Sequence, residues 1–287
     1  VVDARSAAYS LAPLLQGFLH FRPDIRFAGV IFNRVGSARH FGMLQEVCED
    51  LQVECLGYLP KDGLLEQGSR YLGLDFSEPE TDEACRLLGL LEAHIRIDRL
   101  LEITSQPLPE NRTENERLGN RRIAVARNSE SFSFLYTEHL DLLKRYGEVF
   151  FFNPEESAPL PDGIDLLYLP GGYPEKHAEA LRTADVTLDS IRRYIEDGGK
   201  ALAECGGMIY LSQGICQDEQ PDFLSMAGVL PLSISNRKED RRLSLGYRRF
   251  DYNGQTLYGH EFHYTQYVQR SGERLLPTVA QVYNARG

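Results

Sequence analysis

A single cysteine lies between a strand-like and a helix-like segment, and this junction constrains the fold of the chain more than any other feature. Residues 200–211 read KALAECGGMIYL. The apolar Ala-Leu-Ala run predicts a buried strand, and a helical pattern begins after the two glycines. Gly206 and Gly207 supply the backbone freedom that a sharp turn from strand to helix needs. Such a turn lifts the side chain of Cys205 out of the sheet and places it at the N-terminus of the helix.

The position of Cys205 favours a reactive thiol. At a helix N-terminus, the helix dipole and the free backbone N–H groups stabilise a thiolate. We therefore predict that Cys205 is a catalytic nucleophile, for which a pKa well below the ordinary value of about 8.5 is typical. The alternative for an isolated cysteine is a small residue buried at the end of a strand. The Gly-Gly pair and a second glycine-rich motif weigh against that alternative.

The second motif is LPGGYPE at residues 169–175, directly after a predicted strand at 165–169. Pro170 and the following glycines suit a turn whose backbone N–H groups point at a ligand. Such donors form an oxyanion hole when they face a nucleophile. We predict that Gly171 or Gly172 supplies one donor and that the N–H group of Gly206 supplies the other. An ordinary turn from strand to helix is the alternative.

Strands and helices alternate in two blocks, which predicts an α/β protein with two doubly wound, mostly parallel sheets. The first block has predicted strands at 27–32 and 54–59 and predicted helices at 39–51 and 80–103. The second has predicted strands at 122–126, 148–152, 165–169 and 200–203, and predicted helices at 134–146 and 185–197. Short glycine-containing strands at 226–234, 245–252, 256–263 and 279–283 predict a more antiparallel portion.

A polar segment with two prolines and no apolar periodicity separates the blocks. We assign residues 1–104 to a first domain, 105–120 to a linker and 121–287 to a second domain. The alternative is a long surface loop within one domain. Because the opening Val-Val-Asp resembles the end of a buried strand, we expect the chain to begin inside a domain.

Composition narrows the functional classes. The chain has 42 acidic and 31 basic residues and a formal net charge of −11, which argues against nucleic-acid binding and anionic membranes. No apolar run approaches the roughly 20 residues of a membrane span. The 5 cysteines form no CxxC pair, and no signal peptide is visible. These features predict reduced cysteines and a cytoplasmic protein.

Two polar residues end predicted strands of the first block, where open α/β sheets bind ligands. The amide of Asn33 suits the edge of adenine, and Asp3 suits a magnesium–phosphate complex. A plain turn at Asn33 and a helix cap at Asp3 are the alternatives. The chain contains neither GxxxxGK[ST] nor GxGxxG. If the first block handles ATP, we expect its phosphate-binding loop to lie outside this chain.

The segment GHEFHY at residues 259–264 holds two histidines near the end of a β pattern. In a strand, His260 and His263 point to opposite faces, so they are poor joint ligands and we predict no metal site. A cysteine nucleophile needs a nearby imidazole as base. His263 is the candidate for this role, and a hydrogen-bonded structural histidine is the alternative.

Seven motifs, taken together and in this order, make the chain resemble a known protein family. They are GVIFNRVGS (29–37), GYLP (57–60), SFSF (131–134), YLPGGYPE (168–175), AECGG (203–207), LGY (245–247) and GHEFHY (259–264). Over essentially its whole length the chain resembles the cobyrinic acid a,c-diamide synthase family, glutamine-dependent amidotransferases of the cobalamin pathway. Each motif alone is unspecific, and the combination is specific.

The resemblance implies two functional halves. An N-terminal ATP-dependent domain, similar to dethiobiotin synthetase, would hold the nucleotide at Asn33 and Arg34, with Mg²⁺ bridging the phosphates. A C-terminal class I glutaminase domain would release ammonia from glutamine at Cys205, and two corrin carboxylates, a and c, would become amides. The family's phosphate loop is expected before Val1. The catalytic histidine of class I glutaminases follows the nucleophile at a longer distance than His263 does. By this analogy His263 lines the glutamine pocket, and the base lies beyond Gly287.

Other functions remain open at this stage. One is a related amidotransferase acting on hydrogenobyrinate, nickel sirohydrochlorin or later corrin carboxylates. Another is a cysteine hydrolase on a similar elbow, which would act without ATP, and a third is a non-catalytic remnant of the fold. The expected partners are glutamine, ATP and a corrinoid tetrapyrrole, and a homodimer is left open. We expect this chain to be inactive alone.

Overall fold

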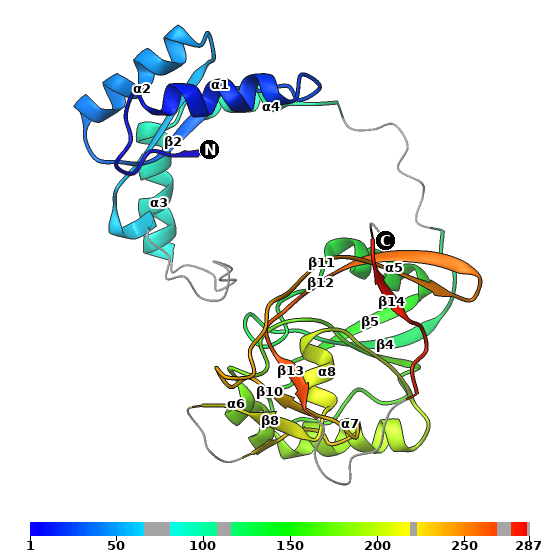
Figure 1. Cartoon of the computed structure of the whole chain (residues 1–287). Coiled ribbons are helices and arrows are strands. Elements are labelled where there is room, and N and C mark those ends of the chain that lie inside the picture. Colours follow the sequence, from blue (N-terminus) through cyan, green and yellow to red (C-terminus); the bar gives the residue numbers. More distant parts are fainter. Residues whose placement is uncertain (66–80, 108–115, 219–222, 269–276, 286–287) are drawn as a thin grey trace. The chain divides into compact units, whose positions relative to one another are not determined.

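The computed structural model describes residues 1–65, 81–107, 116–218, 223–268 and 277–285. The chain divides into two compact units, Val1–Arg112 and Thr113–Gly287 (Figure 1). Residues 108–115 of the predicted linker lie outside the described residues. No helix in the described part is both long enough and apolar enough to cross a membrane.

The first unit is built on a parallel sheet with the order β1-β2-β3. Its strands are β1 (Val2–Asp3), β2 (Val30–Val35) and β3 (Cys55–Pro60), and its helices are α1 (Leu11–Phe21), α2 (Ala38–Asp50), α3 (Thr81–His94) and α4 (Ile97–Thr104), with a 3-10 turn at Gly63–Leu65. Apolar residues of α1, α2 and β2 form one buried cluster, in which Phe32 and Leu44 are fully buried. Helix α2 begins where the Ser37 hydroxyl accepts a hydrogen bond from the His40 N–H group.

The single helix predicted over 80–103 is wrong, because the structure has two helices with a break at Ile95. Ile95 is buried and forms a β-bridge with Gly57 of β3. The next N–H group, that of Arg96, donates to the Leu56 carbonyl over 2.8 Å. At this point the backbone forms hydrogen bonds with β3 instead of continuing the helix. Helical periodicity alone does not reveal such a tertiary contact.

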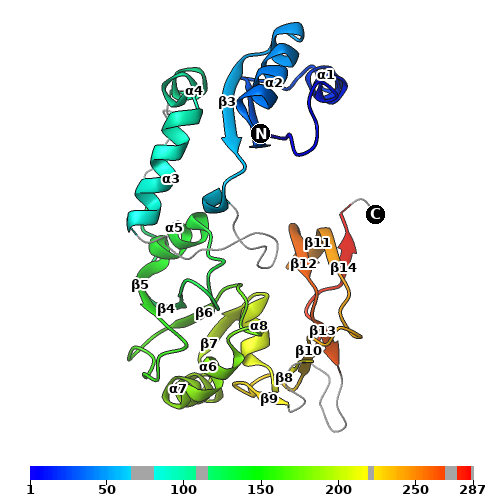
Figure 2. The ribbon, with the colours of Figure 1, turned by 90° about the vertical axis from the view of Figure 1, so that its left-hand side faces the viewer.

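The second unit contains a parallel sheet with the order β5-β4-β6-β7, which confirms the predicted α/β class with parallel sheets. The strands are β4 (Arg121–Ala126), β5 (Gly147–Phe152), β6 (Leu166–Leu169) and β7 (Lys200–Ala203), and the helices are α5 (Thr137–Tyr146), α6 (Ala178–Thr183), α7 (Asp185–Glu196) and α8 (Gly206–Leu211). Buried residues of α6, α7 and α8 pack on one face of this sheet, whereas Leu143 of α5 belongs to a separate cluster on β4 and β6 (Figure 2). The carboxyl ends of the four strands meet at one edge.

Strand β7 is not the buried strand that its apolar sequence predicts. It lies at the edge of the sheet and pairs only with β6 in the described part of the chain. Leu202 is 49% exposed as a result. An apolar run shows that a segment suits a sheet, but it does not show how many neighbouring strands cover it.

The rest of the second unit is mostly antiparallel, as predicted. One sheet has the order β13-β10-β8-β9, in which β8 (Gly214–Cys216) and β10 (Ser233–Ser235) are parallel, and β9 (Leu224–Ser225) and β13 (Gln266–Val268) are antiparallel to their neighbours. A second sheet joins β11 (Ser244–Tyr252), β12 (Gln255–His263) and β14 (Val282–Asn284). Figure 1 shows the long hairpin of β11 and β12 with β14 beside it. In place of the single strand predicted over 226–234, the structure has the short strand β10, which overlaps only the end of the predicted range.

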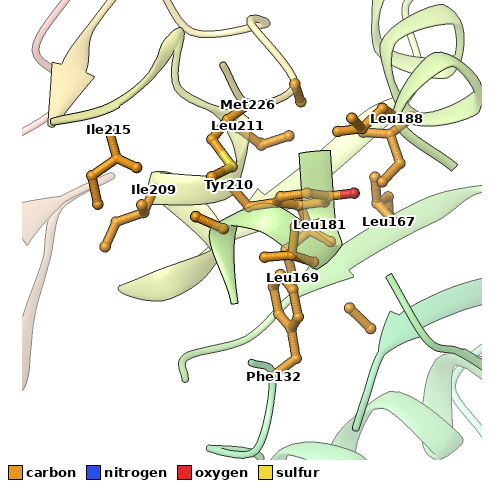
Figure 3. Packing of buried hydrophobic residues seen from close by; sticks show 14 of the residues in the cluster. Phe132, Leu167, Leu169, Leu181, Leu188, Ile209, Tyr210, Leu211, Ile215 and Met226 are labelled. Atoms are coloured by element: carbon orange, nitrogen blue, oxygen red, sulfur yellow. The ribbon is translucent and has the colours of Figure 1, made fainter. Parts of the chain in front are cut away.

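The main core of the second unit surrounds Tyr210 of α8 (Figure 3). Its ring meets that of Phe132 edge to face at 5.4 Å between centroids. Leu167 and Leu169 of β6, Leu181 of α6 and Leu188 of α7 belong to the same cluster. The segment directly after Cys205 is therefore anchored in the core, which fixes the position of the cysteine.

Tyr210→Phe is expected to raise the free energy of unfolding of the second unit by about 1 kcal/mol, because a buried hydroxyl without a partner is destabilising. The Tyr210 hydroxyl is fully buried and has no hydrogen-bond partner among the described residues. Tyr168→Phe is the matched control: its hydroxyl donates to Glu204 over 2.7 Å, so we expect a loss of about 2 kcal/mol. Urea unfolding measures both, and a destabilising Tyr210→Phe would contradict the prediction.

Candidate active site

Cys205 occupies a strained turn between β7 and α8. Its φ is 48° and its ψ is −109°, a conformation that non-glycine residues rarely adopt. The turn is held because the Glu204 N–H group donates to the Leu169 carbonyl over 3.0 Å. The Gly207 N–H group donates to the Glu204 carbonyl over 2.8 Å. This is the geometry of a nucleophile elbow, as the sequence pattern predicts.

The glycine-rich turn after β6 lies directly against this elbow. A Cβ placed on Gly171 would be 3.5 Å from the Cys205 Cβ, and one on Gly206 would be 3.1 Å from the Gly172 nitrogen. Gly172 has a φ of +156°, and a Cβ there would lie 2.1 Å from the Ser131 carbonyl oxygen, so only glycine fits. The structure thus brings together all four residues that the sequence assigned to the nucleophile and the oxyanion hole.

The thiol of Cys205 is not the low-pKa group that the sequence led us to expect. Burial of the sulfur raises its pKa most, and the negative charges of Glu175 and Glu204 raise it further. Hydrogen bonds from the N–H groups of Gly206 and Gly172 act in the opposite direction and are outweighed. The residue nevertheless reaches solvent. Its activation therefore requires a base or a cation beyond these two N–H groups.

The structure does not join His263 to Cys205. Nε2 of His263 lies 2.7 Å from Oε1 of Glu261, and Nδ1 lies 2.9 Å from the Thr265 carbonyl oxygen. Hydrogen bonds from His263 and Arg248 hold the pKa of Glu261 below its ordinary value. Both ring nitrogens of His263 thus have partners, so its role as base or as a glutamine-pocket residue stays a prediction. Within the described ranges, no group of three or more His, Cys, Asp or Glu residues is arranged to hold a metal ion.

Two glutamates beside the thiol were not identified as site residues from the sequence. Glu204 accepts a hydrogen bond from the Tyr168 hydroxyl, which also lies 3.2 Å from Nδ1 of His139. Glu175 is only 8% exposed, and its Oε2 has no hydrogen-bond partner among the described residues. Burial raises the pKa of Glu175 to about 7. Glu175 ends the LPGGYPE motif and Glu204 lies within the AECGG motif, but the sequence does not show that Glu175 is buried or that Glu204 pairs with Tyr168.

A network of polar side chains holds the segment that packs against the glycine turn after β6. The Ser131 hydroxyl donates to Oε1 of Glu155 over 2.7 Å, and the side-chain amide of Asn128 donates to the same oxygen over 3.0 Å. Because the Ser131 carbonyl lies against Gly172, this network fixes one wall of the glycine turn. The Phe134 N–H group closes the other side by donating to the Gly171 carbonyl over 3.1 Å.

The three residues predicted to bind ATP also lie together, at the carboxyl ends of β1 and β2. Asp3 pairs with Asn33 in the sheet register. Nη1 of Arg34 lies 2.8 Å from Oδ2 of Asp3, with both side chains about half exposed at 49% and 47%. The backbone N–H group of Arg5 and the Arg34 guanidinium hold the pKa of Asp3 below its ordinary value. The cluster offers a carboxylate and a guanidinium, the groups that suit Mg²⁺ and phosphate.

Comparison with known proteins identifies relatives of the chain. It is 36% identical over 280 residues to cobyrinate a,c-diamide synthase of Caldanaerobacter subterraneus subsp. tengcongensis, a match that covers 93% of this chain and 61% of the relative. It is 38% identical over 283 residues to hydrogenobyrinate a,c-diamide synthase of Brucella anthropi, covering 94% and 64%. The synthase of the same name from Brucella ovis is 39% identical over 287 residues, with the same coverage of 94% and 64%. The chain thus spans less than two thirds of each of these relatives.

The family match falls on the unit that carries the elbow. Residues 122–287 match the model of the CobB/CobQ-like glutamine amidotransferase domain. This segment contains all but the first residue of β4, the glycine turn after β6, Cys205 and the β11–β12 hairpin. The match covers more than half of the chain and agrees with the resemblance drawn from the seven motifs. The chain therefore belongs to the family of CobB/CobQ-like glutamine amidotransferases.

Proposed function

We propose that this chain hydrolyses glutamine at Cys205, and that the ammonia amidates the a and c side-chain carboxylates of cobyrinic acid in an ATP-dependent reaction of cobalamin biosynthesis. The observation that carries the proposal is the placement of the Cys205 thiol against the N–H groups of Gly172 and Gly206, within a glutamine amidotransferase family. The name of one relative, cobyrinate a,c-diamide synthase, supports cobyrinic acid as the acceptor.

The glutaminase step follows from this geometry. The Cys205 thiolate attacks the side-chain carbonyl carbon of glutamine, and the negative charge moves to the carbonyl oxygen. Because the two N–H groups lie at the sulfur, they are close to the oxygen of the adjacent carbon in the tetrahedral intermediate. The C–N bond then breaks as the nitrogen takes up the proton that the thiol gave to the base, so that ammonia leaves and a glutamyl thioester remains. Water hydrolyses the thioester, which yields glutamate and restores the thiol.

The thiol proton needs an acceptor, since the pKa of Cys205 lies above its ordinary value. His263 has both ring nitrogens engaged, so it would have to release Glu261 or Thr265 before it took this proton. A base supplied from outside the described residues is equally compatible with the elbow.

The ATP-dependent step belongs to the first unit in this proposal. ATP would phosphorylate a corrinoid carboxylate, and ammonia would then displace phosphate to form the amide. Arg34 would bind phosphate oxygens, Asn33 would contact the nucleotide, and Asp3 would share a Mg²⁺ ion with the phosphates. The ion pair between Arg34 and Asp3 must open for both to act. Bound Mg²⁺ would supply charge neutralisation at the phosphates.

Hydrogenobyrinate is a second candidate acceptor, because two of the relatives are named hydrogenobyrinate a,c-diamide synthase. Ammonia-driven, ATP-dependent amidation of cobyrinate and hydrogenobyrinate, measured in parallel on the full-length protein, distinguishes the two. Amidation of neither would contradict the acceptor part of the proposal while leaving the glutaminase part intact.

The glutaminase proposal predicts covalent capture of Cys205 by a glutamine-like electrophile. Incubation with diazo-oxo-norleucine is expected to add one label, which peptide mapping places at Cys205 and which excess glutamine suppresses. Cys205→Ala should take up no label. The exposed Cys85 serves as an internal control, because a general thiol reaction would label it as well. A folded chain without a glutamine-protected adduct would contradict the proposal. Labelling at Cys205 that glutamine does not suppress would favour a cysteine hydrolase of other specificity.

A further inference from the structure

Glu204, the residue directly before the strained nucleophile, is fixed at three points. Its N–H group donates to the Leu169 carbonyl of β6 over 3.0 Å, and its own carbonyl accepts the Gly207 N–H group over 2.8 Å. Its side-chain Oε2 accepts a hydrogen bond from the Tyr168 hydroxyl over 2.7 Å. Both backbone groups and the side chain of this residue are therefore engaged, although the residue reaches solvent.

The Tyr168 hydroxyl is oriented for this contact by its surroundings. Tyr168 is buried in a cluster with Ile123 and Val125 of β4, which fixes its ring. Its oxygen lies 3.2 Å from Nδ1 of His139, in the first turn of α5. Because the hydroxyl has one proton, which it donates to Glu204, it acts as the acceptor towards His139. The proton of the hydroxyl is thus directed at the carboxylate.

The backbone of Cys205 requires support of this kind. Its φ of 48° lies in the left-handed region, where a residue other than glycine is strained. Such a conformation persists only where the surrounding contacts over-determine it. On one side of Cys205, helix α8 is anchored in the core through Tyr210. On the other side, the contacts of Glu204 set the direction from which the chain enters the turn.

The strand that leads into the turn offers little support of its own. Strand β7 lies at the edge of the sheet, and its ladder with β6 ends at Ala203. Ala201 and Leu202 are exposed, so few packing contacts resist a tilt of this strand against its neighbour. The hydrogen bond from Tyr168 holds the chain one residue beyond the end of the ladder, which is where the ladder no longer does so.

We propose that Glu204 is a positioning residue for Cys205, held in place by the hydrogen bond from Tyr168. This inference rests on the proposed glutaminase function. Glu204 acts through the backbone of the next residue and keeps the sulfur aligned with the two N–H groups that would stabilise the oxyanion. Its charge has a separate effect, because it adds to burial in raising the pKa of the thiol. The hydrogen bond needs only an acceptor oxygen, so the two effects can be separated.

The test compares two alkylating reagents at the Cys205 thiol. L-2-Amino-4-oxo-5-chloropentanoate is a chloroketone that resembles glutamine, and chloroacetamide is a small neutral reagent. In both reactions the thiolate sulfur bonds to the CH₂ carbon as chloride leaves, so the thiolate fraction cancels in the ratio of the two rates. Only the chloroketone occupies the glutamine site, so only its rate depends on how the sulfur is aligned. Mass spectrometry follows Cys205 and, as an unaligned reference, the exposed Cys85.

The chloroketone-to-chloroacetamide ratio of the wild type is expected to be higher at Cys205 than at Cys85. At Cys205 it should fall by about tenfold in Tyr168→Phe and in Glu204→Ala, which lose the hydrogen bond. Glu204→Gln should keep the wild-type ratio, because its amide oxygen still accepts from the Tyr168 hydroxyl. The same variant lacks the charge, so the pH profile of its chloroacetamide rate should shift to lower pH.

Ile123→Val is the matched control for a loss of stability. It removes one carbon from the buried cluster that holds the Tyr168 ring and leaves the hydroxyl in place, so the ratio should stay at the wild-type value. A wild-type ratio in folded Tyr168→Phe would overturn the proposal. A ratio in Glu204→Gln as low as in Glu204→Ala would overturn it too, because the charge would then align the thiol. If Tyr168→Phe does not fold, the two Glu204 variants decide.

The wild type distinguishes a failure of this proposal from a failure of the glutaminase function. If its ratio at Cys205 exceeds that at Cys85 and glutamine protects Cys205, a glutamine site is present. Variants that leave this ratio unchanged then overturn the positioning role alone. If the two ratios are equal in the wild type, the thiol is not aligned in a glutamine site, and both proposals are wrong.

Discussion

Gly207→Ala is expected to destabilise the second unit by more than about 3 kcal/mol and to abolish glutamine-protected labelling of Cys205. A Cβ at this position would lie 2.2 Å from the Leu169 carbonyl oxygen and 2.8 Å from the Leu169 Cβ. Neither atom is free to move, because Leu169 is fully buried in β6 and its carbonyl accepts the Glu204 N–H group. The chain must therefore withdraw α8 from the sheet, and the elbow moves with it.

Gly259→Ala is the matched control for this change. Gly259 lies in β12 of the same unit, and a Cβ there would have no heavy atom within 4 Å. We expect its free energy of unfolding to stay within about 0.5 kcal/mol of the wild type, as for an unconstrained surface substitution. Urea unfolding of both variants, combined with labelling of Cys205, measures the difference. A Gly207→Ala protein as stable as Gly259→Ala would show that the close approach of α8 to β6 is not required.

Glu175→Gln is expected to remove a pH dependence of stability worth about 3 kcal/mol. Burial raises the pKa of Glu175 from 4.5 to about 7, so between these values the folded chain binds a proton that the unfolded chain has lost. The unfolded state therefore binds fewer protons, and the free energy of unfolding falls as the pH rises from 4.5 to 7. Above pH 7 both states are ionised, and this contribution is flat.

The measurement is urea unfolding of the wild type and Glu175→Gln at pH 5 and pH 8. The wild type should lose about 3 kcal/mol more than the variant between the two values. A buried glutamine amide also lacks a partner, but its effect is the same at both pH values and cancels in the comparison. Parallel pH profiles would mean that the Glu175 carboxyl group is not buried as described.

The elbow at Cys205 could be predicted from the sequence more fully than the residues that surround it in the fold. The strand, the cysteine, the glycine pair and the following helix are consecutive in the chain, so local pattern predicts the turn at Cys205. The second glycine turn also follows a recognisable strand. Parallel strands end at the same edge of a sheet, which is why Gly172 and Cys205 could be expected near each other before the fold was known.

The chemical environment of the thiol was predicted less well. The sequence indicated a lowered pKa from the helix N-terminus, whereas desolvation and two glutamates raise it. The helix-terminus effect is a local one, and the opposing effects come from residues that reach the sulfur only after folding. His263 illustrates the same limit, since its spacing allowed a role beside Cys205 but its ring is engaged by Glu261 and Thr265.

What the sequence by itself determined is the order of strands and helices, the α/β class, the elbow and the family. These features follow from hydrophobic periodicity and from glycines that lie within a few residues of one another. Both act through the local conformation of the backbone, so they can be recognised in a short stretch of sequence. Tertiary structure alone decided that β7 lies at an edge, that the helix after residue 80 breaks at Ile95, and that Oε2 of Glu175 is buried without a partner. Burial, strand neighbours and electrostatic fields are set by atoms distant in the chain, so no local pattern encodes them.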